Sequence, residues 1–142
     1  MEKGRERTLV ILKPTALERS LCGKIIERLE RAGFLLLAAR LTKFPSDVFV
    51  ELYQEHQGKD FFAEIVKQMS KGPVMAVLLE GDGVVRKVRK LIGSTDPAEA
   101  APGTIRGDFA HAIEPDNLIH ASDSPASARR EIGLFFPEYA KD

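Results

Sequence analysis

The chain has 142 residues, which is long enough for one domain with its own hydrophobic core. Lysine plus arginine (21) balance aspartate plus glutamate (21), so no excess charge points to a nucleic acid or an anionic membrane as partner. The lone cysteine, Cys22, excludes an internal disulfide framework and the cysteine-rich zinc sites. Neither a long apolar run nor a signal sequence is visible. We therefore expect a single domain over residues 1–142, cytoplasmic and not bound to a membrane.

The N-terminal part of the chain alternates strand and helix patterns. Residues 8–13 form an apolar run that predicts a strand ending before Pro14. Apolar residues then recur at helical spacing over residues 21–32, and Gly33 can end that helix in a left-handed conformation. Residues 34–44 are rich in leucine and alanine, which suits a helix. Their position directly after a helix favours a second strand instead.

Two helices are expected next. Ser46 and Asp47 are candidate caps for a helix with apolar residues between 48 and 53. Asp60 is the candidate cap of the following helix, whose inner face carries apolar residues between 62 and 69.

The C-terminal half continues the alternation. Residues 74–79 predict a third strand, and residues 84–92 predict a helix that ends at a glycine. Residues 94–116 are irregular, which is long for a loop inside a compact domain and typical of functional loops. Residues 118–119 predict a short fourth strand. Ser124-Pro125 then begins the last helix, with serine as N-cap and proline at the first helical position.

This order of elements fits the split βαβ pattern of a ferredoxin-like α+β fold, a four-stranded antiparallel sheet with helices packed on it. A doubly wound parallel sheet is the alternative, since its elements also alternate. Neither Gly-x-Gly-x-x-Gly after the first strand nor a P-loop is present, so both standard phosphate-binding motifs are excluded. The strands are apolar on both faces, which predicts that both faces are covered. Helices can cover one face, and an extra segment or a partner subunit is expected on the other.

His120 is a candidate nucleophile because a neutral imidazole is available at pH 7. Such a ring needs one nitrogen held so that the other can attack. Glu131 lies about 60° around the last helix from Ala128, at the edge of its buried face, where a carboxylate can reach a histidine that precedes the helix. Each residue also has an ordinary structural interpretation, a histidine satisfied by the backbone and a solvated glutamate.

Three cations are candidates for a clamp on a polyphosphate, because phosphoryl transfer is catalysed mainly by positioning and charge neutralisation. They are Lys13, Arg89 and Arg106, and Thr95 can add a hydroxyl donor. Phe61 precedes an inward-facing phenylalanine, so its ring can point outward and stack on a base. In the structural alternative the cations are ordinary surface residues and Phe61 packs in the core.

Three motifs together resemble the nucleoside diphosphate kinase family. They are Glu-Arg-Thr-x-x-x-x-Lys-Pro from Glu6, Pro-Gly-Thr-Ile-Arg-Gly-Asp-Phe from Pro102, and Asn-x-x-His-x-Ser-Asp-Ser from Asn117. The resemblance runs from Glu6 to about Phe136, with the motifs in the family's order and near its spacing. In register, the three motifs are highly specific.

The resemblance implies a ferredoxin-like enzyme that transfers the terminal phosphate of a nucleoside triphosphate, typically ATP, to a nucleoside diphosphate. The reaction is implied to be ping-pong through a phosphohistidine at His120, with Glu131 orienting the ring and Ser122 as a nearby hydroxyl. Mg²⁺ is the implied cofactor, held mainly by the nucleotide phosphates, with Asp123 as a candidate contact through water. The implied assembly is a homo-oligomer, either a tetramer or a hexamer. The implied nucleotide-binding residues are Lys13, Tyr53, Arg89, Thr95, Arg106 and Asn117 for the phosphates, and Phe61 and Ile113 for the base.

The chain departs from the family pattern in three places. Thr15-Ala16 stands where Asp-Gly or Asp-Ala is common, Asp60 stands where proline is usual, and an additional residue lies between Phe109 and Asn117. None of these changes removes a residue with a chemical role.

Two other classes of function compete with the kinase. A non-catalytic nucleotide-binding regulatory relative would keep the cations but lose the nucleophile or its glutamate, and this chain retains both. A nucleic-acid-binding module would show exposed aromatic residues and a basic stripe. The balanced charge and the low aromatic content (7%) argue against specific nucleic-acid binding.

Overall fold

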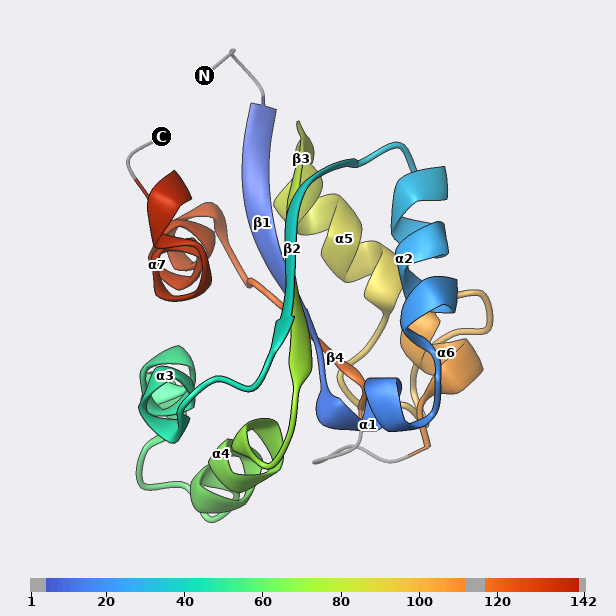
Figure 1. Ribbon diagram of the computed structural model, residues 1–142. Coiled ribbons are helices and arrows are strands. Elements are labelled where there is room, and N and C mark those ends of the chain that lie inside the picture. The colour runs from blue at the N-terminus through green and yellow to red at the C-terminus, as the bar shows by residue number, and fades with distance from the viewer. Residues whose placement is uncertain (1–4, 112–116, 141–142) are drawn as a thin grey trace.

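The computed structural model describes residues 5–111 and 117–140. A four-stranded sheet in the order β2-β3-β1-β4 forms its middle layer (Figure 1). Each neighbouring pair of strands is antiparallel. The ferredoxin-like α+β fold is therefore confirmed, and the doubly wound parallel sheet is excluded. The strands are β1 (Arg5–Leu12), β2 (Leu35–Thr42), β3 (Val74–Asp82) and β4 (Ile119–Ala121).

Helices cover both faces of the sheet (Figure 1). One layer contains α3 (Ser46–Leu52), α4 (Phe62–Ser70) and α7 (Pro125–Phe135). The other contains α1 (Pro14–Glu18), α2 (Cys22–Arg31), α5 (Val84–Ile92) and α6 (Ile105–Phe109). Two short 3₁₀ helices, η1 (Gln54–His56) and η2 (Pro137–Tyr139), follow α3 and α7. The expectation that an extra segment or a partner subunit covers the second face is wrong, because helices of the same chain cover it.

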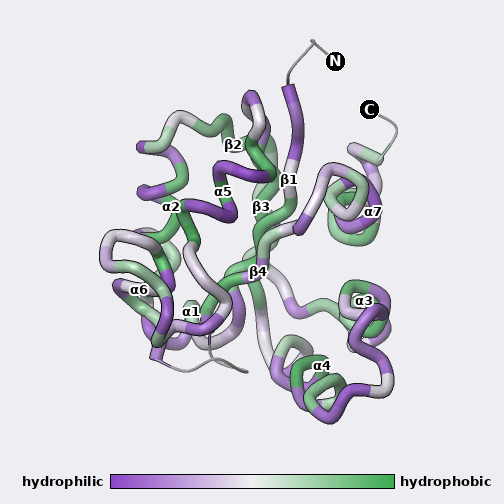
Figure 2. Tube along the Cα trace, turned by 180° about the vertical axis from the view of Figure 1, so that it is seen from behind, coloured by the Kyte–Doolittle hydropathy of each residue, from purple (hydrophilic) through white to green (hydrophobic). Residues whose placement is uncertain are grey.

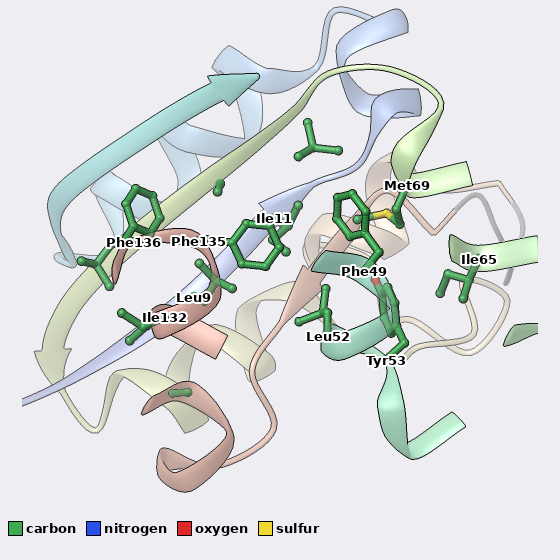
Figure 3. Close-up of a cluster of buried hydrophobic side chains, with 14 of the residues drawn as sticks. Leu9, Ile11, Phe49, Leu52, Tyr53, Ile65, Met69, Ile132, Phe135 and Phe136 are labelled. Atoms are coloured by element: carbon green, nitrogen blue, oxygen red, sulfur yellow. The ribbon is translucent and has the colours of Figure 1, made fainter. Parts of the chain in front are cut away.

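The alternation of side chains along β1 builds two cores from one strand. Leu9 and Ile11 join the cluster under α3, α4 and α7, whereas Val10 and Leu12 join the cluster under α1, α2, α5 and α6. All four are fully buried, and burying such a side chain stabilises the fold by about 1.5–3 kcal/mol. Figure 3 shows the first cluster, with Phe49 and Phe135 beside Ile11. In Figure 2, β1 is hydrophilic at its start and hydrophobic where it runs between the two helical layers.

The predicted N-cap is confirmed for α7 and wrong for α3 and α4. Ser124 is the N-cap of α7 and accepts a hydrogen bond from the Ser127 N–H at 3.1 Å, as expected. The prediction for α3 is wrong, because Ser46 is its first residue and the preceding proline is the N-cap. The prediction for α4 is also wrong, since Phe61 stands at the N-cap and no side chain caps the helix. The turn before α4 has its own main-chain bonds, from Lys59 N to His56 O and from Phe62 N to Lys59 O, and leads directly into the helix.

The sequence does not predict two short α-helices, α1 and α6. Pro14 stops β1 as expected, but it also occupies the first position of α1, where proline is favoured. The stretch predicted to be irregular contains α6, whose N-cap Thr104 accepts a hydrogen bond from the Gly107 N–H at 3.0 Å. Within the described ranges, no helix is both long and apolar enough to cross a membrane.

The end of α5 packs tightly against the start of α6. Gly93 has φ +93°, and a Cβ there would lie 2.6 Å from the Thr104 hydroxyl oxygen. Replacing Gly93→Ala is therefore expected to destabilise the fold by about 1–3 kcal/mol in urea unfolding. Gly23→Ala is the control, because a Cβ at Gly23 in α2 would meet no atom within 4 Å. It should change stability by less than about 1 kcal/mol, and in the stabilising direction. Equal effects of the two substitutions would contradict this account.

Candidate active site

His120 lies in the middle of β4, opposite Ile11 of β1. The strand was predicted to end before His120 but includes it. The neighbours Ile119 and Ala121 belong to the core under α1, α2, α5 and α6, so His120 projects from the opposite face of the sheet. There its side chain is 16% exposed. The His120 and Tyr53 rings make a T-shaped contact with centroids 5.7 Å apart. The nucleophile candidate is thus held by a strand and a ring, with one side open.

Glu131 holds the imidazole from behind. Its Oε1 lies 2.9 Å from His120 Nε2 and accepts a hydrogen bond from the Ser122 hydroxyl at 2.8 Å. An ionised carboxylate only accepts hydrogen bonds, so Nε2 carries a proton, and the lone pair of the neutral ring is on Nδ1. Glu131 is 4% exposed, more buried than the helix-edge position that its spacing predicts. The two residues lie together as the sequence argument requires.

The protonation of Glu131 is set by opposing effects. Burial by itself raises the pKa of the carboxyl group. Hydrogen bonds from His120 and Ser122, together with electrostatic interactions with His120 and Arg130, outweigh burial, and the pKa lies below its usual range. The carboxylate is therefore ionised at neutral pH and able to stabilise positive charge on the ring.

Lys13, Asn117 and Arg106 meet at the other end of the site. Lys13 lies between β1 and α1, and its Nζ donates to Asn117 Oδ1 at 2.6 Å. Arg106 of α6 donates to three main-chain carbonyl oxygens, those of Gly93 (3.1 Å), Asn117 (3.1 Å) and Ile119 (2.6 Å). All three polar side chains are buried. Buried charges need such partners, and these hydrogen bonds fix the chain before β4.

A sharp turn at Leu118 brings Asn117 and His120 to the same side. Leu118 has φ +68°, which is rare for leucine, and the Ile119 N–H donates to Asn117 O at 2.9 Å across it. Lys13 N donates to Leu118 O at 2.9 Å and supports the turn. In a regular strand, side chains three residues apart point to opposite faces. The turn removes this alternation, and both side chains line one cavity.

This cavity has a volume of about 730 Å³. Nearly all the polar and aromatic residues singled out from the sequence line it, namely Lys13, Tyr53, Phe61, Arg89, Thr95, Arg106, Asn117, His120 and Asp123. Ser122 and Glu131 lie behind His120 and not on the cavity wall. Ile113 lies outside the described residues. The cavity lining also includes residues that the sequence analysis did not assign to the site, namely Glu55, His56, Lys59, Ile65, Ile119 and Ala121.

Arg89 and Asp123 form an ion pair at the cavity wall. Arg89 Nη1 lies 2.8 Å from Asp123 Oδ1 and donates to Ala121 O at 3.2 Å. Both side chains are well exposed, so the pair contributes at most about 1 kcal/mol. An arginine held this weakly can exchange its carboxylate partner for a phosphate. Across the part of the chain that the structure describes, no cluster of three or more histidine, cysteine or acidic residues could hold a metal ion.

The sequence pattern of the nucleoside diphosphate kinase family matches residues 6–140. The chain belongs to this family. A nucleoside diphosphate kinase from Methanocaldococcus jannaschii is 51% identical over 134 residues, which are 94% of this chain and 95% of the relative. One from Saccharolobus islandicus is 47% identical over 131 residues, 92% of this chain and 94% of the relative. The resemblance inferred from the motifs is therefore confirmed.

Solved structures of the family have the same fold. The Aquifex aeolicus nucleoside diphosphate kinase superposes with a TM-score of 0.88 at 42% identity, over 93% of this chain and 95% of that one. A halophilic nucleoside diphosphate kinase from Halobacterium salinarum, in complex with CDP, gives 0.89 at 42% identity over 92% and 87%. The family consists of phosphotransferases that bind nucleotides, so the enzyme is favoured over the non-catalytic regulatory relative.

The lowered pKa of Glu131 predicts a pH-dependent contribution to stability. At pH 7, Glu131→Gln should lower the free energy of unfolding by about 1.5–3 kcal/mol, because the hydrogen bonds from His120 and Ser122 lose their charged acceptor. A depressed folded-state pKa stabilises the fold above the ordinary carboxyl range, near 4.3, and this stability disappears as the pH falls through the lowered value. The difference in the free energy of unfolding between the parent and the variant should therefore disappear in acid. Urea unfolding of both proteins from pH 7 to pH 3 measures this difference. The control is Glu64→Gln, because Glu64 is exposed on α4. A gap independent of pH would contradict the assignment.

Proposed function

We propose that the chain transfers the terminal phosphoryl group of a nucleoside triphosphate, typically ATP, to a nucleoside diphosphate by a ping-pong reaction with His120 as carrier. The observation that carries the proposal is the His120–Glu131–Ser122 chain of hydrogen bonds behind a cavity lined by Lys13 and Arg106. The whole chain, residues 1–142, would act as one catalytic domain.

In the first half-reaction, the lone pair on His120 Nδ1 attacks the terminal phosphorus. The bond from that phosphorus to the bridging oxygen breaks, and the nucleoside diphosphate leaves with the bond's electron pair. The imidazole becomes positively charged, which the Glu131 carboxylate stabilises through the proton on Nε2. In the second half-reaction, a terminal oxygen of another diphosphate attacks the same phosphorus, and the P–N bond returns its electrons to Nδ1. Ser122 fixes the carboxylate throughout.

Different residues of the cavity are assigned to the phosphates and to the base of the nucleotide. We assign the phosphates to Lys13, Tyr53, Arg89, Thr95, Arg106 and Asn117. Phe61, a residue on the cavity wall that is 39% exposed, is assigned to the base. Ile113 is assigned to the other side of the base from the family pattern alone. Because stacking does not depend on the edges of the base, this arrangement predicts little preference among bases.

We propose Mg²⁺ as the divalent cation. Asp123 supplies a carboxylate on the cavity wall, and a hard cation of this size keeps several waters and uses few protein ligands. Bound to the phosphates, Mg²⁺ would neutralise charge on the transferred group, with Asp123 as its contact through water. Activity that survives chelation of all divalent cations would contradict this.

We also propose a homo-oligomer, a tetramer or a hexamer. Edge strand β2 carries Leu35 and Leu41, which are 50% and 57% exposed, and large exposed leucines on an edge strand favour contact with another copy. Light scattering distinguishes the two assemblies, and a monomer would contradict both. A cytoplasmic location stays a prediction from the sequence.

The carrier role of His120 is tested by brief incubation with γ-labelled ATP. The parent should acquire an acid-labile, alkali-stable label that disappears when a nucleoside diphosphate is added. His120→Gln should acquire none, because the amide has no nucleophilic nitrogen. An unfolding midpoint close to that of the parent would show that the variant is folded. Normal labelling of the variant would exclude His120 as the nucleophile.

The phosphate role of Arg89 is tested without disturbing the core. Arg89→Ala should lower kcat about 10²-fold, the usual effect of removing one donor from developing charge. The control is Arg86→Ala, because Arg86 is exposed on the same helix and does not line the cavity. It should retain full activity in a coupled assay of triphosphate formation. Equal losses in both variants would indicate general electrostatics and not a specific contact.

A further inference from the structure

His56 joins the two aromatic residues of the cavity. Its ring centroid lies 5.1 Å from that of Phe61 and 6.2 Å from that of Tyr53, which is stacked on it with an interplanar angle of 28°. Tyr53 in turn contacts His120 at 5.7 Å. Two rings, those of His56 and Tyr53, therefore lie in series between Phe61, which is assigned to the base, and His120, which is assigned to the phosphoryl group. The reaction steps above give His56 no role.

His56 is also the anchor of the segment that carries Phe61. Residues 54–61 connect α3 to α4, and all of them are exposed except His56, which is half-buried. Its N–H donates to Tyr53 O at 2.8 Å, and its carbonyl accepts from Lys59 N at 3.0 Å. Gly58, with φ +88°, makes the reversal that follows. His56 thus anchors this segment through its main chain, while its ring contacts Phe61.

Lys59 adds a second contact to both rings. Its Nζ lies 3.3 Å from His56 Nδ1 and 5.9 Å from the centroid of the Phe61 ring. An ammonium group donates and does not accept, so Nδ1 is the acceptor and the His56 ring is neutral in this contact. The cation near the face of Phe61 is attracted by the ring. His56 and Lys59 together restrict the Phe61 side chain.

We propose that His56 is a positioning residue for nucleoside recognition, which orders the Phe61 ring for stacking and leaves the phosphates to other groups. An exposed phenylalanine loses side-chain freedom when a base stacks on it, and a ring already packed against it removes part of that cost. The ordering of one such side chain corresponds to about a three- to tenfold change in affinity. This inference rests on the proposed function, because it takes Phe61 as the base platform.

The test compares two phosphoryl donors that differ only in the base, ATP and ribose 5-triphosphate. Phosphorylation of His120 is followed in the parent and in His56→Ala. The KM for ATP should rise about three- to tenfold in the variant, while kcat stays within about twofold. The KM for ribose 5-triphosphate should not change. A KM that rises equally for both donors, or for neither, would overturn the proposal.

Two further variants separate packing from folding. His56→Phe keeps a planar ring and should restore the KM for ATP to within about twofold of the parent. A phenylalanine variant that folds but is as weak as alanine would overturn the proposal. His111→Ala removes an exposed histidine outside the cavity and should leave both donors unaffected. If His56→Ala does not fold, His56→Asn removes the ring and keeps a polar group, and the same outcomes decide.

Failure of this inference differs from failure of the proposed function. If the parent acquires no label on His120 from either donor, the proposed function itself is contradicted. If the parent is labelled and the two donors respond alike to the loss of the His56 ring, only the role of His56 is contradicted.

Discussion

The hydrogen bond between Glu131 and His120 is the interaction on which the site depends. A carboxylate as buried as Glu131 is costly unless donors surround it, and here they come from His120 and Ser122, which flank the end of β4. This requirement ties α7 to the end of β4, and α7 packs against β1, the strand that pairs with β4. The same bond holds the proton on Nε2. One pairing therefore ties α7 to β4 and leaves the lone pair of the neutral ring on Nδ1, the nitrogen proposed to react.

At the end of the site assigned to the phosphates, the same residues also have two roles. Arg106 donates to carbonyl oxygens on both sides of Leu118, and Lys13 reaches the same turn through its main chain and through Asn117. These buried cations therefore stabilise the irregular segment before β4 while they line the cavity. A group that must bind negative charge is held in place by main-chain oxygens, so it needs little reorganisation when a phosphate arrives.

Local chemistry explains which parts of the fold were predicted. Residues 34–44 form a strand despite their helical propensity, because tertiary pairing with β3 outweighs a weak intrinsic preference. Ser124-Pro125 was predicted correctly, since both residues act on their own helix. Ser46 and Asp60 were not, because the chain entering each helix is already bonded through its backbone. The five-residue helices α1 and α6 are too short for a periodic pattern to reveal them.

The sequence by itself determined the kinds of residue and their order: the three motifs, the candidate nucleophile and the carboxylate proposed to orient it, and the alternation of strands and helices. These follow from local spacing and from side-chain chemistry. Only the tertiary structure decided that helices of one chain cover both faces of the sheet, that Glu131 is buried, and that His56 joins Phe61 to Tyr53. The physical reason is distance along the chain. Lys13 and Asn117 are 104 residues apart, and no local pattern records a contact that folding alone creates.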